Sequence, residues 1–405
     1  MKRLLVIGEY FPPRLGGGRR LFELLTVLSS KYDIRAVVIP PAYVTFIRRS
    51  EDSQNQEDDR IVINNMVGYK LGLPNIFQKI RGKSFVIPFG LVMFYFFFKI
   101  VKKMIKLKPS LVIIDAPSPY SGFLGFLACK LLRIKFIIEY NDIQALYAVE
   151  ILDNNVNFVA KNVLSFIEHQ IIKGGQRATA ISGFVKDYAE YTHGRKDLTV
   201  IPNGADLELF NPRVNGDELR KRYGLSLGIK LCVYAGRIEK CVGADTILQT
   251  ATLLKSRRDI KFMIVGEGDS RMTNELSKLD NVIMTGLVSR ESVPKYLAAA
   301  DMILVPLSCS VASHGISPLK LFESLAMGKI VIATNVTGVR EIITNNYDGI
   351  LLSNSPDLWA SAIIELSSDP KKCSFLGENA IRTAQNYSWN KLAEKFDEVI
   401  ISALD

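Results

Sequence analysis

The sequence predicts an α/β protein built from two doubly wound, Rossmann-like domains. At 405 residues the chain is too long for one compact core, which indicates two domains of ordinary size. Its content of 48% hydrophobic and 23% charged residues is typical of a globular protein. Short β-branched runs alternate with helix-forming stretches along the whole chain, a pattern that predicts parallel sheets with helices on both faces.

Two series of such elements follow one another. In the first, strands are expected at 4–8, 33–39, 110–115, 134–139, 178–181 and 198–201, with helices at 19–30 and 122–132. In the second, strands are expected at 230–236, 260–266, 281–286, 302–306 and 329–334. We therefore expect an N-terminal domain at 1–202, a C-terminal domain at 203–386, and a helix at 387–405 that packs back on the first domain. The polar stretch 50–60 is expected to be a mobile surface loop.

The cysteines and the N-terminus favour a cytoplasmic protein. The five cysteines are scattered and odd in number, without metal-ligand spacing or a disulfide framework. The chain begins with Met1-Lys2-Arg3 and runs directly into a short strand, so no signal peptide is expected.

The net charge of +10 is concentrated at one end. Residues 1–110 contain 19 Lys and Arg against 8 Asp and Glu, whereas the rest contains 32 against 33. The basic half predicts an acidic partner: nucleic acid, anionic lipid or a phosphorylated substrate.

The segment 84–108 favours lipid among these partners. Residues 85–98 form an uncharged, aromatic run that is shorter than the roughly 20 residues of a spanning helix. Four lysines at i, i+3, i+4 and i+7 follow on one helical face: Lys99, Lys102, Lys103 and Lys106. This combination is typical of an element that lies in the interface of an anionic membrane. The alternative is a buried core helix with a solvated lysine face. Nucleic acid is disfavoured because aromatic and basic residues do not alternate.

A loop, helix and strand near the C-terminus predict a nucleotide-sugar site. Residues 313–318 form a loop of mostly small residues, and the helix that follows carries Glu323 before a Gly-Lys turn and the strand 329–334. In such a half-Rossmann unit the helix N-terminus can hold a phosphate. Glu323 then lies where a ribose hydroxyl needs an acceptor.

Four segments together resemble glycosyltransferase family four, the retaining nucleotide-sugar transferases of GT-B architecture. They are Phe11-Pro12-Pro13-Arg14-Leu15-Gly16-Gly17-Gly18, the segment 200–206 around Pro202-Asn203-Gly204, the segment 234–240 around Gly236-Arg237, and 315–323 with its Ala-Met-Gly-Lys continuation. The resemblance covers nearly the full length. It implies two domains that face each other across a cleft. Within the family, the resemblance is strongest to members that build cell-surface polysaccharides or lipid-linked oligosaccharides. It rests on the segments Ser317-Pro318-Leu319-Lys320-Leu321-Phe322-Glu323 and Glu139-Tyr140-Asn141-Asp142.

The resemblance also implies site residues. Arg237 would pair with the departing diphosphate and Lys240 would be the second cation, since fixed cations stabilise that charge best in a dry site. Glu323 would accept from the ribose. The remaining donor-binding residues that we expect are Gly16, Gly17, Gly18, Gly266, Gly286, Leu287, His314, Gly315, Ile316 and Ser317. The glycines let the backbone approach an anion.

The sequence departs from the family pattern at two positions. Gly315 stands where relatives carry the first glutamate of a pair, so His314, the backbone of 315–317 or Lys320 would replace it. The acceptor-side histidine is missing from 137–142, where Asp142 either binds the acceptor or caps the helix expected near Gln144. His169 and His193 are expected to be structural.

These observations predict a metal-independent, retaining transfer from a nucleotide diphosphate sugar to a hydroxyl of a lipid-linked or cell-surface saccharide. No Asp-x-Asp motif is present, and no cofactor is expected. The enzyme would be peripheral on the inner face of the cell membrane. The alternatives are a catalytically silent subunit of a glycan-assembly complex, or another GT-B enzyme such as a nucleotide-sugar epimerase or an α-glucan phosphorylase, which would need a pyridoxal-phosphate lysine. Donor base, sugar and linkage are not encoded in a recognisable motif.

Overall fold

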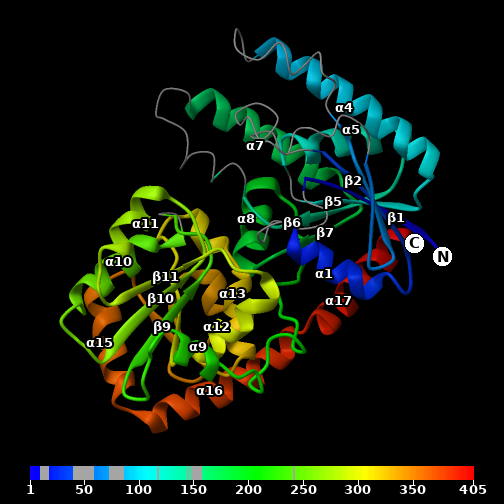
Figure 1. Ribbon diagram of the computed structural model, residues 1–405. Coiled ribbons are helices and arrows are strands. Elements are labelled where there is room, and N and C mark those ends of the chain that lie inside the picture. Colours follow the sequence, from blue (N-terminus) through cyan, green and yellow to red (C-terminus); the bar gives the residue numbers. More distant parts are fainter. Residues whose placement is uncertain are drawn as a thin grey trace. The chain divides into compact units, whose positions relative to one another are not determined.

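The chain folds into two compact units in the computed structural model (Figure 1). One unit is Met1–Ile201 together with Trp389–Asp405, and the other is Pro202–Ser388. The structure describes residues 1–9, 18–39, 59–72, 86–115, 118–143, 146, 157–239 and 242–405. Both units contain a mainly parallel sheet, as the alternation of strands and helices predicts.

In the described part of the first unit the sheet has eight strands, in the order β3-β4-β2-β1-β5-β6-β7-β8. The strands are β1 (Arg3–Gly8), β2 (Asp33–Val38), β3 (Asp59–Ile63), β4 (Met66–Lys70), β5 (Leu111–Asp115), β6 (Phe136–Tyr140), β7 (Arg177–Ala180) and β8 (Leu198–Val200). All neighbours pair in parallel except β3 with β4. The strand order reverses between β1 and β5, and this reversal is the position where open α/β sheets bind ligands.

The hairpin β3–β4 is a feature that the sequence analysis missed. Its turn residues Asn64 and Asn65 both have positive φ angles, 48° and 61°, a conformation that asparagine tolerates well. The expected loop at 50–60 is wrong at its end, because Asp59 and Arg60 begin β3; residues 50–58 lie outside the described part of the chain.

Helices cover both faces of this sheet. The helices are α1 (Arg19–Leu28), α4 (Val86–Leu107), α5 (Ser121–Leu132), α7 (Asn157–Gly174), α8 (Gly183–His193) and α17 (Trp389–Leu404). The helices α4, α5, α7 and α8 contribute to one hydrophobic core, whereas α1 and α17 contact each other (Figure 1). Asp397 of α17 accepts a hydrogen bond of 2.6 Å from the Tyr32 hydroxyl and pairs with Lys31, so the last helix is tied to the chain just before β2.

The predicted interface segment is one continuous helix of 22 residues, α4, with two different faces. Val92, Phe96, Ile100 and Met104, spaced four residues apart, are buried in the core of the unit. The segment therefore belongs partly to the core, as the alternative interpretation held. No helix in the described residues has both the length and the apolar character needed to span a bilayer.

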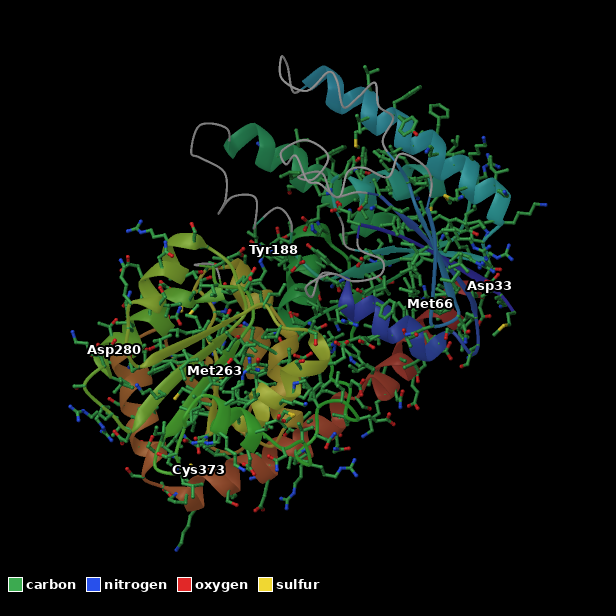
Figure 2. The ribbon with its side chains drawn as sticks, viewed as in Figure 1. Asp33, Met66, Tyr188, Met263, Asp280 and Cys373 are labelled. Atoms are coloured by element: carbon green, nitrogen blue, oxygen red, sulfur yellow. The ribbon has the colours of Figure 1, made fainter. Side chains whose placement is uncertain are left out.

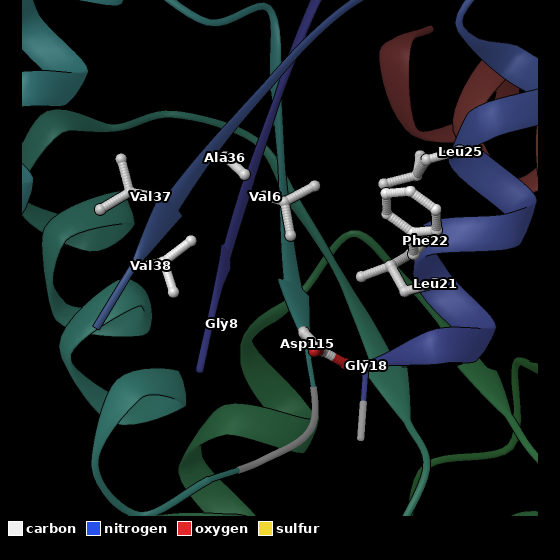
Figure 3. Close-up of a pocket in the computed structure, with 10 residues that line it drawn as sticks. All are labelled: Val6, Gly8, Gly18, Leu21, Phe22, Leu25, Ala36, Val37, Val38 and Asp115. Carbon is white, nitrogen blue, oxygen red and sulfur yellow. The ribbon is translucent and has the colours of Figure 1, made fainter. Parts of the chain in front are cut away.

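A small cavity lies between α1 and the sheet of the first unit (Figure 3). It is lined mostly by apolar side chains, including Val6, Leu21 and Leu25, with Asp115 and Gly18 at one end. Its volume is about 10 Å³, at the lower limit for a single water molecule. We interpret it as a packing gap.

The sheet of the second unit has six strands in its described residues, in the order β11-β10-β9-β12-β13-β14. The strands are β9 (Lys230–Ala235), β10 (Ile260–Val265), β11 (Val282–Gly286), β12 (Met302–Val305), β13 (Ile330–Thr334) and β14 (Ile350–Leu352). All pairs are parallel, and the order is the doubly wound 3-2-1-4-5-6 with its switch point between β9 and β12. Met263 of β10 lies inside the unit and Asp280 at its surface (Figure 2).

The helices of this unit build a separate core on each face of the sheet. They are α9 (Asp217–Arg222), α10 (Ala244–Leu253), α11 (Ser270–Ser277), α12 (Val293–Ala299), α13 (Leu319–Ala326), α14 (Thr337–Arg340), α15 (Pro356–Ser367) and α16 (Pro370–Ala384), with a 3₁₀ turn, η4, at Ala312–Gly315.

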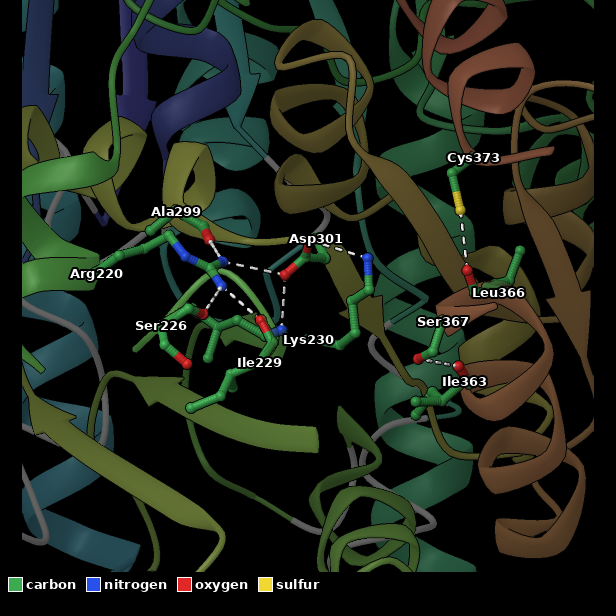
Figure 4. Close-up of polar contacts among 11 residues, drawn as sticks. Arg220, Ser226, Ile229, Lys230, Ala299, Asp301, Ile363, Leu366, Ser367 and Cys373 are labelled. Carbon is green, nitrogen blue, oxygen red and sulfur yellow. Dashed lines mark hydrogen bonds and ion pairs between the residues drawn. The ribbon is translucent and has the colours of Figure 1, made fainter. Parts of the chain in front are cut away.

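A polar network stabilises the amino-terminal edge of the second sheet (Figure 4). Arg220 donates from Nη1 to the Ala299 carbonyl at 2.8 Å and to Asp301 Oδ2 at 3.0 Å. The same Asp301 oxygen accepts from the backbone N–H of Leu231 at 2.8 Å. The network joins β9 and the start of β12 to α9, so its charges are neutralised within the fold.

Candidate active site

The carboxyl edge of the second sheet is a backbone surface made by glycines. Gly236 follows β9 with φ 151°, and Gly266 follows β10 with φ 143°, conformations that favour glycine. A Cβ atom at Gly266 would lie 2.1 Å from the Gly236 carbonyl oxygen, so the two chain segments need this residue type to approach. The Gly266 N–H donates to the Gly286 carbonyl at 3.0 Å. Three strand ends therefore meet without side chains, which leaves room for a ligand at the switch point.

Two cations stand at this edge. Arg237 follows Gly236 directly, its side chain is 65% exposed, and its guanidinium pairs with Glu239. Lys320 of α13 reaches the same strand end, because a Cβ at Gly236 would lie 2.7 Å from Lys320 Nζ. The ammonium group lies 4.0 Å from the centre of the Tyr234 ring.

The ammonium group of Lys320 is largely desolvated, which is unusual for a lysine. Burial lowers the pKa of Lys320 to about 7, although Glu323 acts to raise it. A lysine with this pKa gains a proton readily when an anion binds beside it. The arrangement can therefore stabilise the negative charge of a diphosphate with Arg237 and Lys320 together.

Glu323 lies in α13 and is only 7% exposed. Its Oε1 accepts a hydrogen bond of 2.7 Å from Arg290 Nη1. Arg290 follows β11 and lies over the Phe210 ring at 5.2 Å, while its Nη2 is buried with no hydrogen-bond partner in the structure described. The arginine fixes one carboxylate oxygen and leaves the other able to accept from a ligand hydroxyl.

The loop between β12 and α13 is held by contacts within the second unit. His314 Nδ1 lies 2.9 Å from Thr337 Oγ1 and 3.4 Å from the Thr337 N–H, which places His314 against the first turn of α14. The Asn203 amide donates to the Ser317 carbonyl. Among described side chains, the Ser317 hydroxyl and Asn203 Oδ1 are buried without a hydrogen-bond partner.

Several of the predicted donor-binding residues lie at one edge of the second sheet, and others lie elsewhere or outside the described residues. Gly266 and Gly286 contact each other, and Leu287, with its N–H 3.4 Å from Glu267 Oε1, follows β11. Gly315 ends η4 and is buried, with Ile316 half-buried after it. Gly16, Gly17 and Lys240 lie outside the described residues, and Gly18 precedes α1 of the first unit with φ 70°.

The corresponding edge of the first sheet carries a cluster of acids around one arginine. Arg20, 5% exposed, pairs through Nη2 with Glu139 Oε1 at 2.6 Å. Asn141 receives a hydrogen bond from Arg20 Nε at 3.2 Å and donates to Asp115 Oδ1 at 3.1 Å. Glu9 accepts from the Ser118 hydroxyl at 2.6 Å. These side chains come from the ends of β1, β5 and β6 and from α1.

Two acids of this cluster, Glu9 and Asp115, hold protons more tightly than usual. Burial, and then repulsion by Glu139 and Glu9, raises the pKa of Asp115 to about 7. Asp142 is open to solvent, so it is able to meet a ligand. The helix start near Gln144 that Asp142 was expected to cap lies outside the described residues.

The two other histidines belong to a packed network of the first unit. His193, 1% exposed, lies 3.4 Å from Glu168 Oε1 and 3.4 Å from His169 Nδ1. The Tyr140 hydroxyl donates to the same glutamate. This environment agrees with a structural role.

Comparison with known proteins identifies the class to which this fold and site belong. Residues 17–209 match the family described as "Glycosyltransferase Family 4", and residues 229–369 match "Glycosyl transferases group 1". The chain belongs to this family of retaining GT-B glycosyltransferases, and it is a nucleotide-sugar glycosyltransferase.

Individual relatives are distant. The D-inositol 3-phosphate glycosyltransferase of Thermobispora bispora is 25% identical over 304 residues, which cover 70% of this chain and 69% of the relative. That of Pseudarthrobacter chlorophenolicus is 29% identical, over 59% of this chain and 58% of its own length. The chain thus spans between about half and two thirds of such relatives.

Solved structures share the fold over almost the whole chain. Sucrose-phosphate synthase from Thermosynechococcus elongatus superposes with a TM-score of 0.77 at 16% identity, covering 99% of this chain and 98% of that one. HepE of Anabaena in complex with UDP-glucose gives 0.73 at 14% identity, covering 99% and 100%. The GT-B fold class that the sequence predicts is confirmed.

Sequence reasoning missed Arg290, Asp115 and Glu9, and treated Lys320 only as a substitute for the missing glutamate. The position of Asp115 and Glu9 after buried strands was a usable signal, because parallel strand ends converge at one edge. Arg290 had no such signal, since it follows β11 in a short 3₁₀ turn and meets Glu323 only through the tertiary fold.

Proposed function

We propose that the protein transfers a sugar, with retention of configuration, from a nucleoside diphosphate donor to a hydroxyl of a lipid-linked or cell-surface saccharide. The observation that carries the proposal is the switch point of the second sheet, where Arg237, Lys320 and the buried Glu323 surround a glycine surface. The two cations can stabilise the negative charge of a diphosphate, and the carboxylate that Arg290 holds in place can accept hydrogen bonds from ribose hydroxyls.

In this proposal the donor lies on the second unit. Arg237 and Lys320 contact the diphosphate, with Lys240 as a further cation. Glu323 accepts from the ribose, and Gly266, Gly286 and Leu287 border the nucleotide. His314 and residues 315–317 meet the transferred sugar in place of the missing glutamate. The role of Gly16, Gly17 and Gly18 in binding phosphate stays a prediction from the sequence.

The chemical step is a front-face displacement without a catalytic metal. The bond between the anomeric carbon and the departing phosphate oxygen breaks while the acceptor oxygen bonds to that carbon on the same face. The acceptor proton moves to the departing phosphate. Asp142 orients the acceptor hydroxyl by a hydrogen bond. Treatment with EDTA should leave transfer intact, and a loss that Mg²⁺ restores would contradict a metal-free step.

UDP is the first nucleoside diphosphate to test, because HepE of Anabaena, which shares the fold, has been solved with UDP-glucose. The inositol-phosphate acceptors named for the sequence relatives support a hydroxyl acceptor. A membrane-borne acceptor, and a peripheral position on the inner face of the cell membrane, are supported by the lysine-rich first unit and by the exposed side of α4.

The deciding experiment is a thermal-shift panel of UDP, GDP, ADP, TDP and CDP with metal removed. One diphosphate should raise the melting temperature by several degrees through mass action. The matching radiolabelled nucleotide sugar should then label a lipid extract only in the presence of the enzyme. Binding of no diphosphate would overturn the proposed donor site.

The second candidate is a catalytically silent subunit, and Gly315 in place of a glutamate favours it. Under that candidate Arg237→Ala would leave function in cells unchanged, whereas under our proposal it abolishes transfer.

A further inference from the structure

The outer side of the first unit carries exposed apolar residues on three neighbouring helices. The helix α4 contacts α5, and α5 contacts α7 (Figure 1). The exposed large apolar side chains on these helices, which we call the outer helix face, are Leu91, Phe94, Phe98 and Ile105 of α4, Leu127 and Leu131 of α5, and Val163 and Phe166 of α7.

On α4 the exposed residues form a stripe opposite the buried one. Phe94 is 63% and Phe98 is 52% exposed, and their rings contact each other edge to face at 4.5 Å. They occupy the helix surface away from Phe96 and Ile100, which are fully buried. The core therefore does not account for these aromatic residues, and water is a poor environment for them.

The helices α5 and α7 also have exposed apolar residues beside buried ones. Leu131 is 61% exposed while its neighbours Ala128 and Cys129 are buried. Phe166 is 62% exposed three residues after Val163, and Ile171 of the same helix lies in the core. Each helix packs inward on the sheet with one side and presents apolar residues outward with the other.

The three helices are strongly basic. Their sequences contain seven lysines and a single acid, Glu168, which is 1% exposed and buried against Tyr140 and His193. Lys102, Lys106 and Lys130 are exposed beside the apolar residues. An apolar face bordered by ammonium groups is complementary to a bilayer interface with anionic headgroups. It is a poor surface for a second copy of this chain, because lysines would meet lysines.

We infer that α4, α5 and α7 together form a platform that docks on an anionic membrane, with the exposed apolar residues at the acyl-chain boundary and the lysines on headgroup phosphates. The platform extends the predicted segment 84–108 to two further helices that lie far from it in sequence. The inference rests on the proposed action on a membrane-borne acceptor, and it makes docking a property of the first unit alone.

The test is co-sedimentation of the full chain with vesicles of phosphatidylcholine alone and of phosphatidylcholine with phosphatidylglycerol. The wild type should bind the anionic vesicles, and the binding should weaken with added salt. Phe94→Ser with Phe98→Ser, and separately Leu131→Ser with Phe166→Ser, should each weaken binding by about tenfold or more. Ile401→Ser is the matched control, since Ile401 is 42% exposed on α17 and outside the platform; it should bind like the wild type.

Each outcome decides one point. An unchanged affinity of the α5–α7 double variant would show that α4 docks alone and would overturn the platform. An absence of anionic vesicle binding, or a dimer that the substitutions dissociate, would overturn membrane docking. Circular dichroism and the donor-induced thermal shift are measured on every variant, so a failure of donor binding is recognised separately from a failure of docking.

Discussion

The two sheets carry opposite charge at the same topological position. At the switch point of the first sheet, Glu9, Asp115 and Glu139 gather around Arg20. At that of the second sheet, Arg237 and Lys320 lie beside Gly236, and Arg290 pairs with Glu323. The same α/β architecture thus produces an acidic edge in the first unit, which is suited to hydrogen bonds with hydroxyl groups. In the second unit it produces a basic edge, which is suited to phosphate.

The difference teaches that the strand order supplies a location and the residues after each strand supply the chemistry. Glycines end β9, β10 and β11, so a ligand can approach the backbone there. Glu9 follows β1 and Asp115 ends β5, and burial raises the pKa values of both carboxyl groups, with repulsion by Glu139 and Glu9 adding to the effect at Asp115. Four substitutions break or sharpen this comparison.

The largest effect is expected for Arg237→Ala at the basic edge. In the proposed function the guanidinium stabilises charge that develops on the departing diphosphate, and loss of such a group typically costs roughly 100- to 1,000-fold in kcat. Single-turnover kinetics with saturating donor measure the change. Arg271→Ala on α11 is the matched control because this arginine is exposed and lies on a helix surface. An equal loss in both variants would contradict the assignment.

A smaller effect is expected for Arg290→Gln. Without the ion pair of 2.7 Å, Glu323 is no longer held in place, and a hydrogen bond to a charged group contributes enough for roughly a tenfold change in affinity. Titration calorimetry should show the wild type preferring UDP over 2′-deoxy-UDP, and the variant losing most of this preference. If both ligands weaken equally, Arg290 only supports the fold.

The third effect is a pH dependence that originates in Lys320. Its pKa of about 7 in the free protein must rise when a diphosphate binds, so binding takes up a proton. Affinity for UDP should therefore fall by up to about tenfold per pH unit above pH 7. Lys320→Arg, which keeps its charge, should show little slope between pH 7.5 and 9. Parallel slopes for the two proteins would exclude Lys320 as the titrating group.

The smallest effect is expected at the acidic edge, in the stability of Asp115→Asn. The folded-state pKa of about 7 lies above the unfolded value near 4, so the ionised form is disfavoured in the fold and stability falls as pH rises through this window. The melting temperature of Asp115→Asn should decline less than that of the wild type between pH 5 and 7.5, by a few degrees.

The matched control is Asp33→Asn at the opposite edge of the same sheet. Burial acts to raise the pKa of Asp33, but hydrogen bonds from Arg3 and Arg35 lower it overall. Asp33 is therefore ionised throughout the window, and its substitution should lower stability without changing the slope with pH. A change of slope in the control alone would contradict the role given to Asp115.

Much of the fold was accessible from the sequence because strand and helix periods are local. The strands that were predicted lie within a residue or two of their expected positions; for example, β10 ends at Val265 where the prediction ended at 266. The hairpin β3–β4 was not predicted because its strands are partly polar, and the edge strand β14 was not predicted either. For segment 84–108 the sequence predicts either an interface element or a core helix. The buried face of α4 agrees with a core helix, and the interface element stays a prediction.

The sequence by itself determined two doubly wound sheets, the glycosyltransferase family and the position of Glu323, since hydrophobic period, glycine placement and short motifs are properties of neighbouring residues. Only the tertiary structure decided that Arg290 holds Glu323, that Lys320 joins Arg237, and that Asp115, Glu139 and Arg20 share one cluster. These partners are separated by 24 to 119 residues along the chain. Parallel pairing of the strands, together with the helices α1 and α13 that carry Arg20, Lys320 and Glu323, brings them together. Their pKa values follow from that proximity and from burial, which no local pattern encodes.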